Sequence, residues 1–332
     1  MDSLTHITFG AVLGGLVFGR KAGVRPFLYG ALVGTLPDID ALFMDDGIGA
    51  LLVHRGVTHS IFFQALAIPI LVAAVLAFFR DQRPHWRRWT LLTGLVFATH
   101  SVLDTLNPYG VQLFLPFSDD FVSLNAVYVV DPLFTLPLLI GLWVAWRYRG
   151  AARPAAALAL ACCVVYAGTG LLGRLHVEEV AAQVFEQQGI DTQVFATPTP
   201  FNIALWRVLA VDDERYYEGY YSYLDGTGAV DFERVGTRGR SWSGLDEHES
   251  VARLKRFAAG FYAFHREGET IVMRDLRLGQ RDYYPVSFVV ARWSDDGIEL
   301  LPDRRAATVS PGLGELHWLW SRMWQPSMTP TA

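Results

Sequence analysis

Five short polar clusters interrupt the apolar N-terminal half of the sequence, and all are rich in side chains that bind metal ions. They are Asp2-Ser3-Leu4-Thr5-His6, Pro37-Asp38-Ile39-Asp40, His54-Arg55-Gly56-Val57-Thr58-His59-Ser60, His100-Ser101-Val102-Leu103-Asp104 and Asn107-Pro108-Tyr109-Gly110. Ionisable side chains within membrane-grade apolar sequence are costly, so they indicate function by default. The clustering predicts a metal site rather than residues scattered for solubility.

The residue types and spacing in these clusters indicate which metals the site would bind. His100 and Asp104 lie four residues apart on a predicted helix, so both project from one face. Imidazole suits zinc, carboxylates suit magnesium and manganese, and bridging carboxylates support two-metal hydrolysis. We therefore predict one or two divalent ions, with zinc favoured over manganese or magnesium. The predicted metal ligands are His6, Asp38, Asp40, His59, His100 and Asp104.

Other polar residues of the same clusters are predicted to act on the substrate. A metal-bound water ionises at about pH 7, which supplies hydroxide for hydrolysis near neutral pH. Arg55 offers a planar fork of N–H donors that matches the oxygens of a phosphate. We predict catalytic roles for Asp40, His54 and Arg55, and substrate contacts for Arg55, Asn107 and Tyr109.

Each of these interpretations has a structural alternative. His100 and Asp104 could form a buried hydrogen-bonded pair between two helices. Asp38 and Asp40 could cap the next element, and Arg55 could pair with either of them. The Asn-Pro-Tyr-Gly sequence is also a good turn.

Five apolar regions must position the clusters. The first is a pair of short segments, Ile7–Phe18 and Phe27–Leu36, and neither crosses the ~30 Å hydrocarbon layer alone. We expect them to form a short helical hairpin shielded by other helices. The other four regions are long enough to span a membrane or nearly so: Ile61–Phe79, Thr90–Leu106, Val129–Trp146 and Ala155–Leu172.

The distribution of basic residues orients these regions. Ten of the twelve basic residues between Met1 and Leu175 fall in three loops: Arg20, Lys21 and Arg25; Arg80, Arg83, Arg87 and Arg88; and Arg147, Arg149 and Arg153. The positive-inside rule places these loops in the cytoplasm. Every metal-ligand cluster then lies toward the opposite end, so we expect one extracytoplasmic site in a multi-pass protein of the bacterial inner (cytoplasmic) membrane.

The sequence changes character after Leu175, where charges become frequent and membrane-length apolar runs end. Val177–Gln188 predicts a short amphipathic helix that leaves the membrane. Segments with strand-like composition follow at Ala204–Val211, Tyr216–Tyr223, Thr270–Leu276 and Val286–Trp293, with one helix predicted at Glu247–Phe257. We therefore predict a mainly α, membrane-embedded helical bundle over residues 1–175, followed by a small α+β soluble domain over 176–332. This second domain, of unknown role, should be extracytoplasmic.

The content of charged residues and the net charge indicate which classes of partner to expect. Charged residues make up only 18% of the 332-residue chain, below the ~25% typical of soluble domains. The net charge of −5 gives no electrostatic reason to expect nucleic acid as a partner. We expect membrane lipids as partners instead, and the sequence does not predict an oligomeric state.

The motifs together resemble a known family. Asp2-Ser3-x-Thr5-His6, Leu36-Pro37-Asp38-x-Asp40, His54-Arg55-Gly56-x-Thr58-His59-Ser60 and His100-x-x-x-Asp104-x-x-Asn107-x-Tyr109-Gly110 are similar to those of the YdjM-like family. That family is described as LexA-regulated, inner-membrane-associated, metal-dependent hydrolases. The resemblance covers roughly Met1 to Leu175. It implies a metal-dependent hydrolase without naming a substrate.

Three functions are compatible with these residues. The first is hydrolysis of a small-molecule or lipid phosphoester by metal-activated water at the outer membrane face. The second is a metal-binding membrane scaffold or sensor without catalysis. The third, an ion transporter, predicts polar residues throughout the bilayer, whereas here they cluster at one end. The sequence therefore favours the hydrolase, with the scaffold as the alternative.

Overall fold

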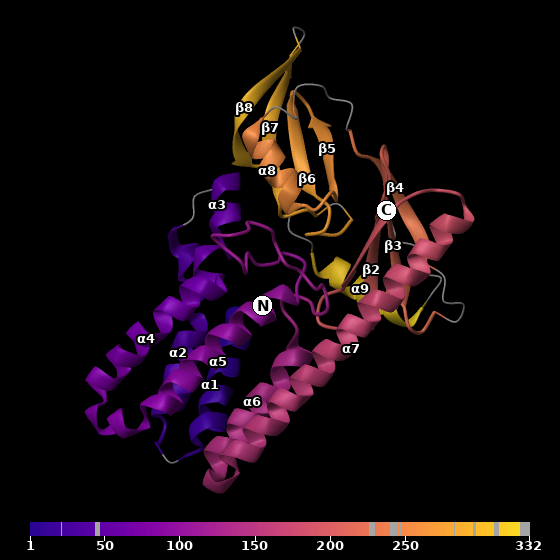
Figure 1. Ribbon diagram of the computed structural model, residues 1–332. Coiled ribbons are helices and arrows are strands. Elements are labelled where there is room, and N and C mark those ends of the chain that lie inside the picture. Colours follow the sequence, from indigo (N-terminus) through magenta and orange to yellow (C-terminus); the bar gives the residue numbers. More distant parts are fainter. Residues whose placement is uncertain are drawn as a thin grey trace. The chain divides into compact units, whose positions relative to one another are not determined.

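The computed structural model describes residues 1–20, 22–43, 47–225, 230–239, 245, 248–281, 283–294, 297–308 and 312–325. Figure 1 shows a helical N-terminal region followed by a β-sheet domain. The chain divides into two compact units, Met1–Met44 with Val53–Thr169 and Asp45–Leu52 with Gly170–Ala332. The predicted order of a helical region and then a domain with strands is confirmed.

The first unit consists of α-helices joined by short 3-10 turns and, between α5 and α6, by an irregular segment over residues 106–131. Its helices are α1 (Ser3–Phe18), α2 (Arg25–Thr35), α4 (Ile61–Phe78), α5 (Trp86–Thr105), α6 (Pro132–Arg147) and the first part of α7 (Ala152–Gln187). Its 3-10 turns are η1 (Pro37–Phe43), η2 (Val57–His59), η3 (Arg80–His85) and η4 (Arg149–Ala151), and α3 (Ile48–Val53) lies between η1 and η2 in the chain. Side-chain oxygens of Asp2, Ser60 and Asp131 cap the first turns of α1, α4 and α6, which fixes where these helices begin. Lys21, one of the residues in the basic loops, lies outside the described residues.

The two short N-terminal segments form a tight helical hairpin, as the sequence predicts. A Cβ atom added to Gly10 would lie 2.1 Å from the carbonyl oxygen of Gly30, and one added to Gly14 would lie 2.2 Å from that of Pro26. Glycines therefore let the backbones of α1 and α2 touch, which is the way small residues pack apolar helices in membranes. The hairpin holds His6 on α1 close to the end of α2.

Among the described residues, two helices are long and apolar enough to cross a membrane, namely α4 and α7. Helices α1 and α6 are apolar but shorter. Of the four longer regions predicted to span, Ile61–Phe79 and Ala155–Leu172 match these two helices, whereas Thr90–Leu106 and Val129–Trp146 do not. Helix α7 extends to Gln187. The short amphipathic helix predicted at Val177–Gln188 is therefore not separate but the last part of α7, except for Gln188.

The second unit contains two four-stranded antiparallel sheets, each with its strands in sequence order. The first sheet has β1 (Gln193–Pro198), β2 (Leu205–Val211), β3 (Arg215–Ser222) and β4 (Asp231–Thr237), and the second has β5 (Tyr262–Glu267), β6 (Thr270–Asp275), β7 (Ser287–Ser294) and β8 (Gly297–Arg305). The four predicted strands correspond to β2, β3, β6 and β7. Helix α8 (Glu249–Phe257) corresponds to the predicted helix, of which Glu247 lies outside the described residues. Strands β1, β4, β5 and β8 and helix α9 (Leu313–Trp324) were not predicted.

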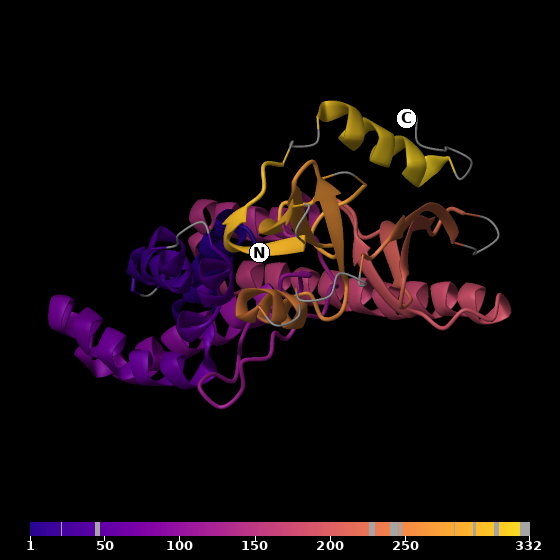
Figure 2. The same cartoon turned by 90° about the horizontal axis from the view of Figure 1, so that it is seen from above.

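Helices cover both faces of the first sheet (Figure 2). On one face, Val177 and Ala181 of α7 pack with Trp206. On the other face, Trp318 of α9 packs with Tyr220. Because neighbouring residues of a strand point to opposite faces, the sheet forms a layer between α7 and α9.

A buried ion pair lies at the centre of the second unit. Glu218 on β3 accepts two hydrogen bonds from Arg207 on β2, at 2.9 and 3.2 Å. Tyr284 also donates to Glu218, and Arg207 donates to the carbonyl oxygen of Leu276 beyond β6. Burial alone would raise the pKa of Glu218, but the charge of Arg207 and the hydrogen bonds that Glu218 accepts from Arg207, Arg281 and Tyr284 together outweigh it and hold that pKa below its ordinary value. The pair thus links the two sheets.

Candidate metal centre

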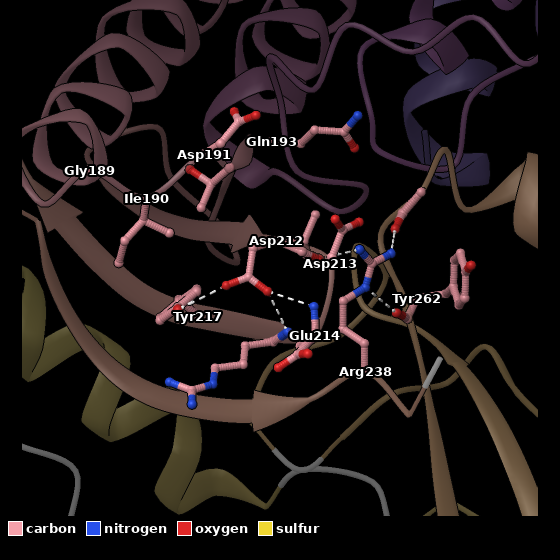
Figure 3. Close-up of a pocket in the computed structure, with 14 residues that line it drawn as sticks. Gly189, Ile190, Asp191, Gln193, Asp212, Asp213, Glu214, Tyr217, Arg238 and Tyr262 are labelled. Carbon is pink, nitrogen blue, oxygen red and sulfur yellow. Dashed lines mark hydrogen bonds between the residues drawn. The ribbon is translucent and has the colours of Figure 1, made fainter. Parts of the chain in front are cut away.

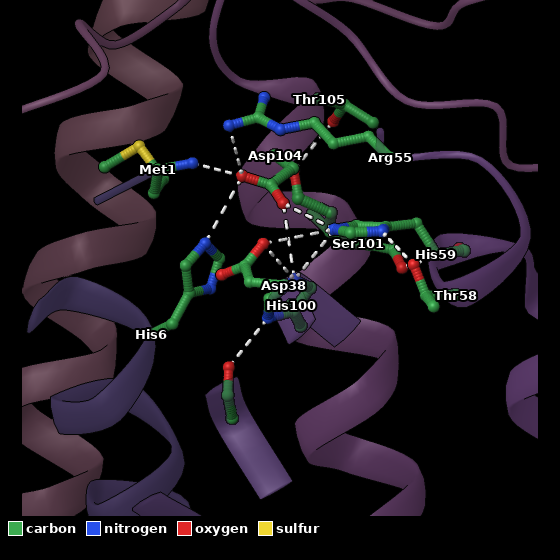
Figure 4. A network of polar contacts seen from close by, with 12 residues as sticks. Met1, His6, Asp38, Arg55, Thr58, His59, His100, Ser101, Asp104 and Thr105 are labelled. Atoms are coloured by element: carbon green, nitrogen blue, oxygen red, sulfur yellow. Dashed lines mark hydrogen bonds and ion pairs between the residues drawn. The ribbon is translucent and has the colours of Figure 1, made fainter. Parts of the chain in front are cut away.

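Four predicted metal ligands from three separate segments converge in the first unit (Figure 4). Asp38 comes from η1, His59 from η2, and His100 and Asp104 from consecutive turns of α5. One ligand atom of each lies within 4.8 Å of all the others. His59, His100 and Asp104 are fully buried, while the side chain of Asp38 is 23% exposed. This group could hold a metal ion.

The spacing of the four ligand atoms fits an ion at their centre. The separations are 3.0 Å from His59 Nε2 to His100 Nε2, 3.2 Å from His59 Nε2 to Asp104 Oδ2, 3.4 Å from His100 Nε2 to Asp104 Oδ2, 3.5 Å from His59 Nε2 to Asp38 Oδ1 and 3.6 Å from His100 Nε2 to Asp38 Oδ1. The sixth separation, between the Asp38 and Asp104 oxygens, is at most 4.8 Å. A regular tetrahedron with edges of about 3.3 Å has its centre about 2.0 Å from each corner, which is a metal–ligand bond length for nitrogen and oxygen donors, so the five shorter separations suit an ion and the sixth fixes how regular the site is.

Hydrogen bonds behind the two imidazoles fix which nitrogen carries the proton. The carbonyl oxygen of Gly34 can only accept, so His100 donates Nδ1–H to it at 2.8 Å. The Thr58 hydroxyl donates to Asp40 and therefore accepts from Nδ1–H of His59, each at 2.9 Å. In their neutral forms, both rings then direct an unprotonated Nε2 at the other across 3.0 Å. Two facing lone pairs in a buried site are unfavourable unless a metal ion lies between them or one Nε2 takes up a proton, which it would donate to Asp38 or Asp104.

The second oxygen of Asp104 faces cationic and polar groups rather than the cluster. Oδ1 lies 3.4 Å from the Arg55 guanidinium and 3.3 Å from Nε2 of His6, and it also contacts the amino group of Met1. His6 stacks on the ring of His100 at 3.9 Å, and its buried Nδ1 has no hydrogen-bond partner among the described residues. His6, a predicted ligand, thus lies beside the four-residue group and not within it.

Asp40, also a predicted ligand, lies behind His59. Its carboxylate accepts from His54 Nδ1 at 3.0 Å, from the Thr58 hydroxyl at 2.9 Å and from the backbone N–H of Arg55 at 3.2 Å. Burial would raise the pKa of Asp40, but the hydrogen bonds from His54 and Thr58 keep it below its ordinary value. An ionised Asp40 can therefore organise the whole segment from His54 to His59.

The same balance holds for the carboxylate of Asp38, which lies in the four-residue group. Burial would raise the pKa of Asp38, whereas its contacts with His100 and His59 lower it well below the ordinary value. The group therefore presents an anionic oxygen on its partly exposed side.

The three residues predicted to contact substrate also come together, next to Asp104. Arg55 donates from NH1 to Asn107 Oδ1 at 3.0 Å, and its guanidinium lies 4.9 Å from the ring centre of Tyr109. Arg55 adopts a left-handed φ of 60°, which costs energy in a residue other than glycine and is typical of functional sites. Arg55 Nε and Asn107 Nδ2 are buried without a hydrogen-bond partner among the described residues. Two donors are therefore available beside the cluster.

Some supporting residues were not predicted. Gln64 donates to the Ser101 hydroxyl at 2.9 Å and to the Thr58 carbonyl at 3.1 Å, while Ser101 donates to the carbonyl of His59. The signal for Gln64 was present in the sequence, because it is a single polar residue in the otherwise apolar helix α4. The role of the Gly34 carbonyl as acceptor for His100 could not be predicted from the sequence, because every residue has a backbone carbonyl.

Comparison with known proteins agrees with the motifs. Residues 1–177 match the YdjM inner membrane protein family, and these residues contain the entire cluster. The chain belongs to this family. It is also 25% identical over 308 residues to the uncharacterized protein YfhP of Bacillus subtilis (strain 168), covering 87% of this chain and 90% of that protein. No solved structure matches the chain. Membership in the YdjM family and the two long apolar helices make it a membrane-associated protein.

Proposed function

We propose that this protein is a metal-dependent hydrolase of the inner membrane that cleaves a phosphoester, either of a small molecule or of a lipid or lipid-linked compound. The observation that carries the proposal is the cluster of Asp38, His59, His100 and Asp104, in which the two imidazole Nε2 atoms lie 3.0 Å apart beside two carboxylate oxygens. Zinc fits this mixture of nitrogen and oxygen donors best, and the number of ions is one or two.

The residues around the cluster have roles that follow from their contacts. Asp38, His59, His100 and Asp104 would hold a divalent ion, which would supply a bound water with a pKa of about 7 and stabilise negative charge. Arg55, stacked on Tyr109, binds an anionic oxygen of the substrate, and the free amide N–H of Asn107 donates to another. His54, held at Nδ1 by Asp40, presents Nε2 as the atom that accepts or donates a proton.

The arrangement of charges supports an extracytoplasmic site in a multi-pass protein. The cluster lies at the N-terminal end of α1 and the C-terminal end of α5, whereas the basic loops lie at the opposite ends of these helices. The positive-inside rule then places the cluster away from the cytoplasm. Helix α7 starts at a basic loop, so the C-terminal unit that follows it is extracytoplasmic as well.

One observation favours the alternative of a metal-binding scaffold or sensor. Three of the four ligands are 2% exposed or less, and structural metal sites are closed whereas catalytic sites keep an open position. The partly exposed Asp38 is the side from which water would enter in the hydrolase.

Elemental analysis followed by activity measurements separates these functions. Wild-type protein purified in mild detergent should contain one or two equivalents of metal, and a His100→Ala/Asp104→Ala variant should contain none. Asp131→Asn is the matched control, because Asp131 is a buried carboxylate that caps α6 and lies outside the four-residue group. Metal retained without cleavage of phosphomonoesters, phosphodiesters or phospholipids would favour the scaffold. A metal-free wild type after supplementation would reject both.

A further inference from the structure

The second unit has an aromatic end and an acidic end. Helix α7 runs along the first sheet, with Gly173 against Trp206 and Tyr223 at one end and Phe185 against Tyr217 at the other. One end of the first sheet therefore lies beside Gly173 of α7, and the other end lies beside Phe185.

The apolar part of α7 stops where the aromatic end begins. The 20 residues from Pro154 to Gly173 carry no charge, and Arg174 follows directly. About 20 apolar residues are needed to cross a bilayer as a helix. A spanning α7 would thus leave the hydrocarbon layer near Gly173, where a Cβ atom would lie 2.4 Å from the hydroxyl oxygen of Tyr223.

Exposed apolar side chains gather at this same end of the first sheet. Tyr223 and Leu224, in the segment that follows β3, are 45% and 51% exposed, and Phe201 in the loop between β1 and β2 is 44% exposed. His176, one turn beyond Gly173 on α7, stacks on Tyr223 and shares a hydrogen bond with Tyr221. These loops are therefore held at the point where α7 becomes polar.

Helix α9 adds two tryptophans to this end. Trp320 and Trp324 lie four residues apart on its outer face, are 61% and 56% exposed, and contact each other edge to face. The end of α9 is attached to the end of β3, because Ser222 donates to the carbonyl of Met323. Arg322, on the inner face of α9, pairs with Asp225 at 2.9 and 3.0 Å, so these buried charges neutralise each other.

The far end of the sheet has the opposite character. A cavity of about 840 Å³ lies there, and Figure 3 shows four acidic residues around it: Asp191, Asp212, Asp213 and Glu214. Asp191, Asp213 and Glu214 are exposed. Arg215 and Arg238 also line this cavity, so its four negative charges are only partly balanced. A charged, net acidic end and an aromatic end beside the apolar part of α7 give the unit a defined polarity.

We propose that the aromatic end, defined as Phe201, Tyr223, Leu224, Trp320 and Trp324, lies in the headgroup region of the bilayer that α7 crosses. Tryptophan and tyrosine are enriched at membrane–water interfaces, since their rings are apolar and their N–H and O–H groups remain hydrated. Continuity with α7 identifies the bilayer as the partner rather than another protein. The proposal does not depend on metal binding or on hydrolysis.

Fluorescence quenching in reconstituted bilayers tests this directly. The full chain is placed in nanodiscs whose lipids are brominated either near the headgroup or near the bilayer centre. The difference in tryptophan fluorescence between wild type and the Trp320→Phe/Trp324→Phe variant reports on these two residues. This fluorescence should be quenched by bromines near the headgroup, and its maximum should lie at a shorter wavelength than that of tryptophan in water. Trp293→Phe is the matched control, because Trp293 is a partly exposed tryptophan of β7 in the second sheet. The fluorescence lost in Trp293→Phe, which comes from Trp293, should not be quenched by either brominated lipid.

Two results would overturn the proposal. Quenching of Trp320 and Trp324 by acrylamide in the water, and not by either lipid, would place this face in solvent. Quenching by neither agent would mean that protein covers the face, such as a second copy of the chain. Circular dichroism and metal content identical to wild type would show that both variants fold.

Discussion

Replacing Thr58 by valine tests the interpretation that a hydrogen-bond chain prepares His59 for a metal ion. The Thr58 hydroxyl is the link between the carboxylate of Asp40 and Nδ1 of His59, with both contacts at 2.9 Å. Valine keeps the shape of threonine but removes both hydrogen bonds. His59 is then free to place its proton on Nε2, the atom that must be unprotonated to bind the ion.

The expected loss is in metal affinity, not in folding. Partners that orient metal ligands from behind contribute 10–100-fold to affinity, or about 1.4–2.8 kcal/mol. We therefore expect Thr58→Val to bind metal about 10–100 times more weakly than wild type, whereas His59→Ala should abolish binding. Competition with a chelator of known affinity, on purified protein in detergent, measures this difference.

Thr99→Val is the matched control for this experiment. Thr99 is also a threonine of the first unit, but its hydroxyl donates only to backbone carbonyls of its own helix, α5. It should leave the affinity unchanged. If Thr58→Val also binds metal as wild type does, the chain from Asp40 to His59 does not set the imidazole proton, and our interpretation of the cluster is wrong.

Three further predictions concern the two units separately. Gly10→Ala places a Cβ atom 2.1 Å from the Gly30 carbonyl oxygen and should destabilise the first unit by about 1–3 kcal/mol in chemical unfolding. Gly168→Ala, in α7 with open space around it, should be neutral or stabilise by up to about 1 kcal/mol. Removing metal with a chelator should lower the melting temperature of the first unit only, because an ion at 100 times its Kd stabilises by about 2.7 kcal/mol. Because the folded pKa of Glu218 is lowered from 4.5, its pairing with Arg207 should stabilise the second unit above about pH 4.5 and be lost as the pH falls further. Thermal melting against pH should show this slope, and Glu218→Gln should reduce it to the part contributed by other carboxylates such as Asp212, while costing about 3–5 kcal/mol at neutral pH.

The convergence of the cluster could be anticipated because the signals in the sequence agree. His100 and Asp104 share a helical face by their spacing alone, and the basic loops place Asp38 and His59 at the same end of the helices. Strands such as β2 and β3 could be predicted because β-branched and aromatic residues are frequent in them.

What could not be predicted depends on contacts between distant segments. The sequence places Asp40 and His6 with the ligands, but only the structure distinguishes a carboxylate behind His59 from one in the four-residue group. Helix α9 was missed although Trp318, Leu319 and Met323 form a buried apolar stripe along it, because the exposed Trp320 and Trp324 add apolar residues to its outer face. The positive φ of Arg55 likewise depends on Asp40 accepting its N–H, a contact across 15 residues.

The balance of charge at the cluster links its structure to the proposed chemistry. Asp38 and Asp104 contribute two negative charges, whereas Arg55 and the Met1 amino group both contact Oδ1 of Asp104, the oxygen that faces away from the cluster. The other oxygens, Oδ1 of Asp38 and Oδ2 of Asp104, face two imidazoles in a largely buried site, where a cation is favourable. A divalent ion would neutralise the two carboxylates and leave the positive charge of Arg55 next to the unpartnered donors of Arg55 and Asn107. The same residues that require a cation for stability therefore attract an anion once it is bound, as a site for a phosphoester must.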